Sequence, residues 1–561
     1  MLDFAKDKKL WDRVRTSDDF ARHRQVIKEK YDNAFKEEMH TLNYSEIFGK
    51  KSDVYGGVYM RRLFRLQSSA LMSMIYYDNE EYFDNLVDTI WDYCNEYTWA
   101  PLGHYNSYYN RKPTDYDPGL IDIYASSIAF SLAEIKHLMA DRLPQIVIDR
   151  ITAEIRRRTI EPYINRRFFW EHHDNNWTAV CAGAVGGVLL YEAPDVYEAN
   201  RERLRASMQC YINSYADDGV CVEGSAYWGF GFGFFTVFAS LLYEYSGGKE
   251  NYFEIPKVKQ MAMFIQKTFL DTNCMVSFGD CNPTENYWIG LPHMLKLYYG
   301  DAIDNLPEAK GTIMAYQHFA FALRSVIYFD KKYVSNEELK PVLYNMKSSG
   351  WMLKRTTKYG IAIKGGNNGE SHNHNDVGSF ILAKDNKEIF VDVGAGPYVD
   401  GYHGNKRYTF FHPSSWSHNV PYFGDKPQDG IRREPNVIID YDEKTNTASY
   451  EFARAYGLDY VKSINRSFVL NEDNIILTDV FDVVDGTPIT ERFVTYSKPV
   501  LEGDVLILDG VKFKPDIPAK PDIKYVKAPN HVNSDTFTDV YCIDYTLPLN
   551  VKTFKAEIKI D

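Results

Sequence analysis

The sequence predicts a multidomain α+β protein, in which helical hairpins come first and an antiparallel β-sandwich follows. The chain has 561 residues, a length that suits two or three domains better than one. Apolar residues recur at helical spacing up to about residue 325, whereas short apolar runs bounded by turn residues follow from about residue 335. We place the boundary near Tyr333–Met346 and divide the chain into residues 1–335 and 336–561.

The helical period is clearest at Ile128, Leu132, Ile135 and Met139, which would lie on one face of a helix. Similar apolar stripes predict helices at Leu63–Tyr77, Tyr82–Tyr97, Thr178–Leu190, Leu204–Tyr215, Phe232–Tyr245 and Val258–Phe269. Because the breaks between them are short, we expect antiparallel hairpins. A ring of such hairpins would leave a central cleft lined by the connecting loops.

The second part alternates apolar runs with turn signals such as Gly365-Gly366 and Asp485-Gly486. The predicted strands are Trp351–Arg355, Tyr359–Ile363, Val377–Ala383, Glu388–Val393, Ala448–Ala453, Ile464–Leu470, Asn474–Val483, Thr490–Tyr496 and Val551–Ile560. Many short strands at this rhythm indicate a β-sandwich.

Composition excludes several classes of protein. A net charge of −13 without a basic stripe argues against a nucleic-acid partner, and no run is long enough to predict a membrane span. The seven cysteines form no CxxC pair and predict reduced thiols. No signal peptide is visible, so we expect a cytoplasmic protein from the sequence as given, or a periplasmic or secreted one if a leader has been removed. Tyr and Trp often line sugar clefts, and the chain has 43 Tyr, but aromatic residues also fill cores.

The densest group of chemically active residues is Ser371–Asp376, directly before the apolar run Ser379–Ala383. If this segment were extended, His372 and His374 would point to the same side. Two imidazoles on one face are half of a metal site or an acid/base device with a partner. A polar loop whose histidines bond to the backbone is the simpler alternative.

Two further segments lie in the helical part. His172–Trp177 precedes a helix rich in small residues, and one Asn or Asp in it is expected to cap that helix. Small residues allow close packing, which would place this loop at the cleft. In Glu223–Gly233, Tyr227 stands where a helix begins, and a tyrosine hydroxyl with a lowered pKa can act as general base and acid. The alternation of Gly with aromatic residues is also typical of a core helix.

Asp392 follows an apolar strand, and His418 comes after Trp416-Ser417. Together with His374 they would supply two imidazoles and one carboxylate, a set that suits a Zn²⁺-type ion. By spacing alone this trio is a weak prediction, because adjacent strands would have to bring the three residues together.

Taken in order, these segments resemble the heparinase II/III-like polysaccharide lyases. The matching pieces are Asn175-Asn176-Trp177, Glu223-Gly224-Ser225-Ala226-Tyr227-Trp228-Gly229, Ser371–Phe380, Val391-Asp392-Val393-Gly394 and His418-Asn419. The resemblance covers most of the chain. It implies an N-terminal incomplete (α/α) toroid followed by a C-terminal antiparallel β-sandwich, with the active site between them.

The resemblance also implies residue roles. Asn176 would hold the uronate carboxylate, with Asn175 as its rival, Tyr227 would exchange protons with the sugar, and His372 would be the second acid/base. The implied substrate-binding residues are His173, Asn175, Trp177, Glu223, Trp228 and Asn373. Many relatives have histidine where this chain has Trp177, so His172, His173 or an arginine would have to help neutralise the carboxylate. His374, Asp392 and His418 resemble the family's structural metal site, which implies a divalent ion, zinc by preference, and no organic cofactor.

The function we predict is β-elimination in uronate-containing polysaccharide or oligosaccharide, most plausibly a glycosaminoglycan of hyaluronan, chondroitin or heparan sulfate type. Donors such as the Asn176 amide would stabilise the enolate formed when C5 loses its proton. Alginate is the nearest rival substrate. The sequence also leaves open an α/α-barrel glycoside hydrolase and a cupin-like metal protein with His372 and His374 on one redox ion. The expected partner is an acidic glycan, with no nucleic acid and no membrane; a homo-oligomer is open.

Overall fold

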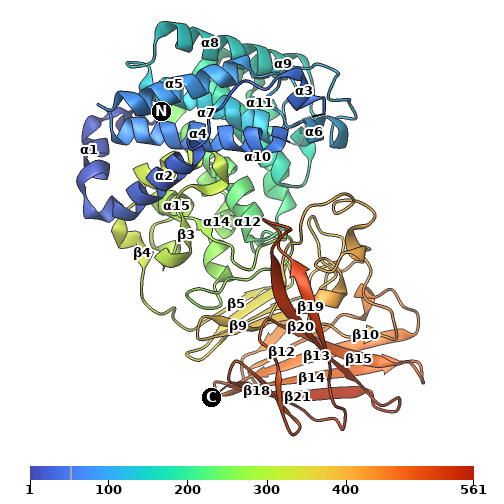
Figure 1. Cartoon of the computed structure of the whole chain (residues 1–561). Coiled ribbons are helices and arrows are strands. Elements are labelled where there is room, and N and C mark those ends of the chain that lie inside the picture. Colours follow the sequence, from blue (N-terminus) through green and yellow to red (C-terminus); the bar gives the residue numbers. More distant parts are fainter. Residues whose placement is uncertain (51–53, 561) are drawn as a thin grey trace.

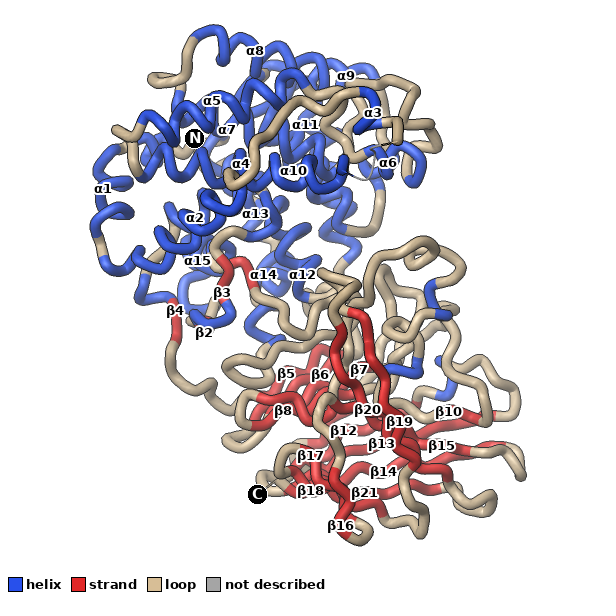
Figure 2. The backbone as a smooth tube through the Cα atoms, viewed as in Figure 1, coloured by secondary structure: helices blue, strands red, loops and turns tan. Residues whose placement is uncertain are grey.

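The computed structural model describes residues 1–50 and 54–560, which form a helical part and a strand part (Figure 1). The α-helices lie in the first 330 residues and the large sheets follow, with only short 3-10 helices among the loops of the strand part, as Figure 2 shows in blue and red. The main helices are α1 (Lys8–Thr16), α2 (Ala21–Ala34), α4 (Tyr55–Ile75), α5 (Glu80–Asn95), α6 (Leu102–Ser107), α7 (Ile123–Met139), α8 (Gln145–Ile155), α9 (Glu161–Asn165), α10 (Asn176–Glu192), α11 (Pro194–Ser214), α12 (Ser225–Tyr227), α13 (Gly233–Tyr245), α14 (Pro256–Ala262), α15 (Gly290–Tyr299) and α16 (Phe319–Ile327). The predicted order of the two parts is confirmed.

The helices form hairpins that are arranged in two shells. α7, α10, α13 and α16 are apolar on nearly all sides and buried, which is typical of inner helices. α5, α8 and α11 bury one face against them and expose the other. The contacts α4 with α5, α7 with α8 and α10 with α11 join inner to outer helices, and this pairing gives the expected incomplete toroid.

Small residues bring the inner helices close together, as the sequence predicted for the helix after Trp177. A Cβ added to Gly183 would lie 2.9 Å from the carbonyl oxygen of Phe234 on α13. A Cβ on Gly187 would lie 2.4 Å from the Phe130 ring on α7. Because neither glycine has room for a methyl group, α10 packs directly against both neighbours.

The strand part contains three antiparallel sheets. Their orders are β5-β6-β7-β8-β9, β10-β15-β20-β19 and β11-β12-β13-β14-β21-β18-β17-β16. The strands are β5 (Val342–Met346), β6 (Trp351–Arg355), β7 (Gly360–Lys364), β8 (Phe380–Lys384), β9 (Lys387–Phe390), β10 (Tyr422–Phe423), β11 (Asp440–Asp442), β12 (Thr447–Glu451), β13 (Val461–Leu470), β14 (Asn474–Val483), β15 (Ile489–Thr495), β16 (Val500–Glu502), β17 (Val505–Leu508), β18 (Val511–Pro515), β19 (Asp522–Pro529), β20 (Phe537–Thr546) and β21 (Thr553–Lys559). Apolar side chains of the opposed sheets meet between them, as for Phe380 and Phe468, so the predicted sandwich is confirmed.

The β5–β9 sheet is buried on both faces. Ile361 and Ile363 on β7 face the core of the sandwich, whereas Ala362 belongs to the core of the helical part. On β8, Ile381 likewise packs with the helices. Since alternate residues of a strand point to opposite faces, one sheet completes both cores and fixes the two parts against each other.

The stretch Ser225–Tyr245 has the length and apolar composition of a membrane span, but 83% of its most apolar window is buried inside the protein. It therefore packs as a core helix of the toroid. The seven cysteines are unpaired in the described chain, in agreement with the predicted reduced thiols.

Replacing Gly183 by Ala tests the close contact between α10 and α13. Alanine favours a helix over glycine by about 1 kcal/mol, but the new methyl group would push against a backbone carbonyl. We expect a net loss of about 1–3 kcal/mol in the free energy of unfolding, seen as a lower melting temperature. Gly57→Ala, on an exposed turn of α4 with no atom within 4 Å of the added Cβ, is the matched control and should not lower stability. Equal stability of the two variants would show that the helices are not in tight contact.

Candidate active site

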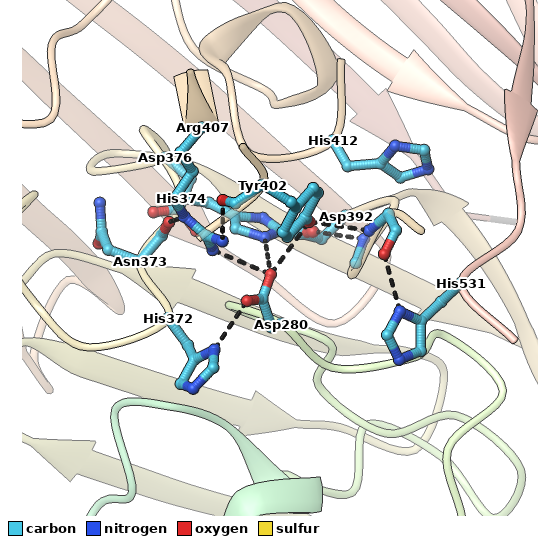
Figure 3. A network of polar contacts seen from close by, with 12 residues as sticks. Asp280, His372, Asn373, His374, Asp376, Asp392, Tyr402, Arg407, His412 and His531 are labelled. Atoms are coloured by element: carbon cyan, nitrogen blue, oxygen red, sulfur yellow. Dashed lines mark hydrogen bonds and ion pairs between the residues drawn. The ribbon is translucent and has the colours of Figure 1, made fainter. Parts of the chain in front are cut away.

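Asp280 is the centre of the polar network between the two parts (Figure 3). Its Oδ2 accepts a hydrogen bond from His372 Nδ1 at 2.8 Å. Its Oδ1 accepts from His374 Nε2 at 3.1 Å, from the Tyr402 hydroxyl at 3.1 Å and from Arg407 Nη2 at 2.9 Å. Burial by itself would raise the pKa of Asp280, but the hydrogen bonds from His372 and His374 and the Arg407 charge hold it well below its usual range. Asp280 is therefore a carboxylate that fixes both histidines.

The two histidines reach Asp280 from a loop and not from a strand. β8 begins only at Phe380, and His372 has a φ of 54°, in the left-handed region. The expectation of an extended backbone was wrong, because a turn precedes the strand. The turn aims His372 and His374 at different oxygens of one carboxylate, so they do not form a single metal face of cupin type.

Tyr227 and His372 form a stacked pair. Their ring centroids lie 4.1 Å apart with an interplanar angle of 24°. The Nδ1–H of His372 is held by Asp280, which leaves Nε2 to exchange protons. Burial raises the pKa of the Tyr227 hydroxyl well above its ordinary value, so the phenol is a proton donor at neutral pH. The expectation of a lowered pKa is wrong for this structure.

Asn176 and Tyr227 line one small pocket, with a cavity volume of about 120 Å³. Glu223, Ser371 and Arg432 also line it, so both parts of the chain contribute to its wall. The Asn176 side chain is 7% exposed and has no hydrogen-bond partner among the described residues. Its amide is therefore available to a ligand in this pocket.

Asn175 also lines this pocket, whereas His173 does not. Asn175 is the N-cap of α10, and its Oδ1 accepts the backbone N–H of Trp177 at 3.0 Å. The predicted cap is therefore Asn175, and its amide oxygen is committed to the helix. The His173 side chain is exposed, and its Nδ1 lies 3.6 Å from a carboxylate oxygen of Asp174.

Three carboxyl groups also border the pocket, namely the exposed Asp174 and the side chains of Glu223 and Glu370. Glu223 is buried, and burial raises its pKa while the nearby His372 opposes this shift. Burial likewise raises the pKa of Glu370 to about 7, with the Lys364 charge opposing it. In each residue Oε2 has no hydrogen-bond partner within the described chain. In the protonated form both groups are donors, which reduces their repulsion toward an anionic ligand.

His374, Asp392 and His418 come together in the sandwich part, all fully buried. One ligand atom of each lies within 4.8 Å of the others. Within the part of the chain that the structure describes, His374 Nδ1 has no hydrogen-bond partner, and Asp392 Oδ2 and His418 Nδ1 face only each other. Asp392 Oδ2 and His418 Nδ1 are 3.2 Å apart, close to the roughly 3.3 Å that separates two ligands of a tetrahedral Zn²⁺.

The outer atoms of the three side chains are all hydrogen-bonded. His374 Nε2 donates to Asp280, His418 Nε2 donates to the carbonyl of His412 at 3.1 Å, and Asp392 Oδ1 accepts from Gly394 N–H at 2.9 Å. Such outer partners orient metal-ligating side chains. Each side chain is therefore held by a hydrogen bond at its outer atom, and its inner atom is available as a ligand. This arrangement fits a divalent ion.

Three predicted substrate contacts are buried away from the pocket. Trp228 is fully buried and donates its indole N–H to the Met261 carbonyl, so the prediction that it contacts substrate is wrong. Asn373 is 3% exposed and donates to the Asn368 carbonyl, which gives it a structural role. Trp177 is 7% exposed because other aromatic rings cover it. At Trp228, the alternation of glycine with aromatic residues therefore belongs to a packed core and not to a sugar-binding cleft.

Sequence reasoning missed Asp280, Arg407, Tyr398 and Arg432. The Tyr398 hydroxyl shares a 2.7 Å hydrogen bond with that of Tyr227, and Arg432 lines the Asn176 pocket. Arg432 is one arginine that can help to neutralise a carboxylate there. Asp280 lies alone between Gly279 and Cys281, without periodicity or a neighbouring motif to mark it.

Comparison with known proteins finds a family model that matches one domain of the chain and solved structures that share its fold. Residues 340–505 match the family model described as heparinase II/III-like, C-terminal. A heparinase III gene product superposes with a TM-score of 0.61 at 12% identity, covering 96% of this chain and 84% of that one. A heparan sulfate lyase of Pedobacter heparinus gives 0.60 at 14% identity, with 99% and 85% covered.

A chondroitin AC lyase of Streptomyces coelicolor A3, in complex with chondroitin sulphate, gives a TM-score of 0.56 at 10% identity, with 98% and 82% covered. No curated protein sequence matches the chain. Residues 340–505 thus match the heparinase II/III-like C-terminal domain, in a chain that has the toroid-and-sandwich fold of heparinase III and chondroitin AC lyase.

Proposed function

We propose that the protein is a polysaccharide lyase that cleaves uronate-containing glycans by β-elimination, with glycosaminoglycans as the substrate class. The observation that supports this most directly is the meeting of three residues from distant segments: Asn176 and Tyr227 line one pocket, and His372 stacks on Tyr227. Proteins named as lyases of heparan sulfate and chondroitin share the fold, which agrees with the proposal.

The reaction needs an electrophilic contact at the uronate carboxylate. In this proposal the free amide of Asn176 donates a hydrogen bond to the carboxylate and stabilises the enolate that forms when C5 loses its proton. The Arg432 guanidinium, which pairs with the exposed Glu434 at 2.7 Å, lies at the same pocket and adds positive charge. Because burial raises the pKa of both Glu223 and Glu370, these carboxyl groups cancel less of that positive charge than fully ionised glutamates would.

The proton transfers fall to the stacked pair. Nε2 of His372 accepts the C5 proton, because Asp280 holds the opposite nitrogen as a donor. The Tyr227 phenol donates its proton to the departing O4, in line with its raised pKa. Since the two rings are stacked, both groups approach the sugar from one side. That arrangement favours uronates whose C5 hydrogen and O4 lie on the same face, as in D-glucuronate and D-mannuronate, over L-iduronate.

Glu223 and Glu370 support one runner-up function. Two carboxyl groups at one pocket, one with a pKa of about 7, are also what a glycoside hydrolase requires. The products separate the two reactions, because only elimination creates a C4–C5 double bond, which absorbs ultraviolet light.

Assaying wild type and Tyr227→Phe on a panel of polymers tests the proposed function. The panel contains hyaluronan, chondroitin, heparan sulfate, dermatan sulfate and alginate, and the readout is ultraviolet-absorbing product. We expect cleavage of glucuronate polymers and a loss of about 10²-fold or more in turnover for Tyr227→Phe, because the ring stays and the proton donor is lost. Reducing ends without the absorbing product would favour the hydrolase.

Substitutions of Asn176 test its contact with the carboxylate. Asn176→Asp places a negative charge against the substrate's own, so binding and turnover should both collapse near neutral pH. Asn176→Ala only removes a donor and should be milder. Activity of the Asp variant should return in part at acid pH, where the new carboxyl is protonated. If Ala and Asp variants were equally impaired at every pH, Asn176 would not face the uronate.

We further propose that His374, Asp392 and His418 hold a structural divalent ion, zinc by its preference for two imidazoles and one carboxylate. When bound, the ion would link the loop before β8 to the segments after β9 and before β10. Through His374 it would also steady Asp280, on which His372 depends.

His374→Ala should lower bound metal and melting temperature together, because metal binding adds to folding free energy. His372→Ala should keep the metal and the melting temperature yet abolish turnover. Metal content is measured by elemental analysis of the purified protein and stability by thermal unfolding, with and without a chelator. Equal metal loss in both variants would contradict the separate roles.

A further inference from the structure

The Asn176 pocket is too small for the polymer that the proposed function requires. Its volume of about 120 Å³ is well below the roughly 300 Å³ or more that enclose a small-molecule ligand. It therefore holds only part of one sugar unit, and the neighbouring units must lie on the surface beside it.

An aromatic surface lies at the start of α10, the helix whose first residue, Asn176, lines the pocket. The Trp177 ring, one residue after Asn176, lies 4.3 Å from the Tyr108 ring and 5.3 Å from the Phe169 ring, centroid to centroid. The rings of Tyr108 and Phe169 are parallel within 3°, with centroids 6.1 Å apart. We call Tyr108 and Phe169, with Trp177 beneath them, the aromatic shelf.

The two upper rings of the shelf, Tyr108 and Phe169, are exposed to solvent, whereas Trp177 beneath them is buried. Tyr108 is 44% and Phe169 39% exposed, whereas Trp177 is 7% exposed. Two parallel exposed rings on a rigid base offer the apolar faces against which sugar rings stack. Arg167, two residues before Phe169, is exposed and has no carboxylate partner in the described chain, which suits an acidic glycan.

A fixed imidazole stands at the edge of the shelf. The His104 ring lies 5.0 Å from Tyr108 and 5.3 Å from Trp177. Its Nδ1 bonds to Oδ2 of the fully buried Asp122, while Asp122 Oδ1 accepts the N–H groups of Tyr124 and Ala125 at the start of α7. The His104 side chain is 20% exposed, and Nε2 has no partner in the described residues. The ring is thus locked in place, and Nε2 is free to accept a hydrogen bond from a sugar hydroxyl.

We propose that the aromatic shelf and His104 form a second sugar-binding subsite, which takes a unit of the acidic glycan next to the one held at Asn176. This proposal rests on the proposed function for the identity of the ligand. Stacking on Tyr108 and Phe169 provides affinity, and His104 Nε2 recognises a polar group on the same sugar. The subsite lies beside Trp177, the residue that follows Asn176. Because the Trp177 side chain is buried beneath the shelf, His104 supplies the polar contact there.

The test compares long and short substrates in variants of the shelf. Tyr108→Leu and Phe169→Leu keep Trp177 covered but remove the aromatic faces. For the polymer that the wild-type enzyme cleaves best, we expect the double variant to raise KM about tenfold with kcat changed less than about twofold. The effect should shrink as the substrate is shortened to the smallest oligosaccharide that is cleaved. His104→Ala should raise KM in the same length-dependent way.

Tyr116→Leu is the matched control. Tyr116 is 53% exposed on the same loop region, but it packs against Tyr97 and accepts a hydrogen bond from Arg157, and not against Trp177. The Tyr116→Leu substitution should leave KM unchanged for substrates of every length. Melting temperatures of all variants verify folding.

A binding measurement separates this proposal from the proposed function. Polymer is titrated into the Tyr227→Phe variant, with and without the shelf substitutions, and tryptophan fluorescence is followed. Weaker binding without the shelf supports the subsite even if the wild-type enzyme makes no unsaturated product, a result that would overturn only the lyase assignment. Equal binding, or an equal rise in KM for long and short substrates, would overturn the subsite.

Discussion

The site depends on one buried carboxylate, Asp280, which belongs to the helical part and accepts hydrogen bonds from four side chains of the strand part. A charge buried at this depth is stable only when it is fully paired, and Arg407 and the two histidines supply that pairing. The same contacts set which nitrogen of His372 holds its proton and turn His374 toward Asp392. A single residue thereby links proton transfer, a candidate metal site and the joining of the two parts.

Packing puts that carboxylate in place. The β5–β9 sheet contributes side chains to both cores, so the two parts cannot separate without exposing apolar surface. In the toroid, α10 begins at Asn176 and α12 at Ser225, and both helices contribute residues to the pocket. Close contacts at Gly183 and Gly187 hold α10 in place. The pocket wall carries the Asn176 amide and the Arg432 guanidinium, two donors that suit an anionic ligand.

The hydrophobic pattern was enough to predict nine of the seventeen strands from β5 to β21 in the described chain and the longer helices of the toroid, but not the long strands β19 and β20. Asn474–Val483 and Trp351–Arg355 have the predicted bounds, because alternating or continuous apolar runs flanked by turns leave little choice. The short strands from β16 to β18 were not predicted, since three to five residues give too weak a period. Trp228 was misplaced because glycines beside aromatic rings occur equally in a packed core and at a cleft.

The sequence by itself determined the order of the two folds and the residue types of the site, because these follow from local periodicity and from the chemistry of dense polar segments. It also predicted that His374, Asp392 and His418 would act together, and the structure does bring these three side chains together. Only the tertiary structure selected Asp280 as the anchor, Asn175 as the helix cap and Asn176 as the free amide. Those assignments depend on contacts between residues about a hundred positions apart or on the direction of a single side chain, and neither has a local signal.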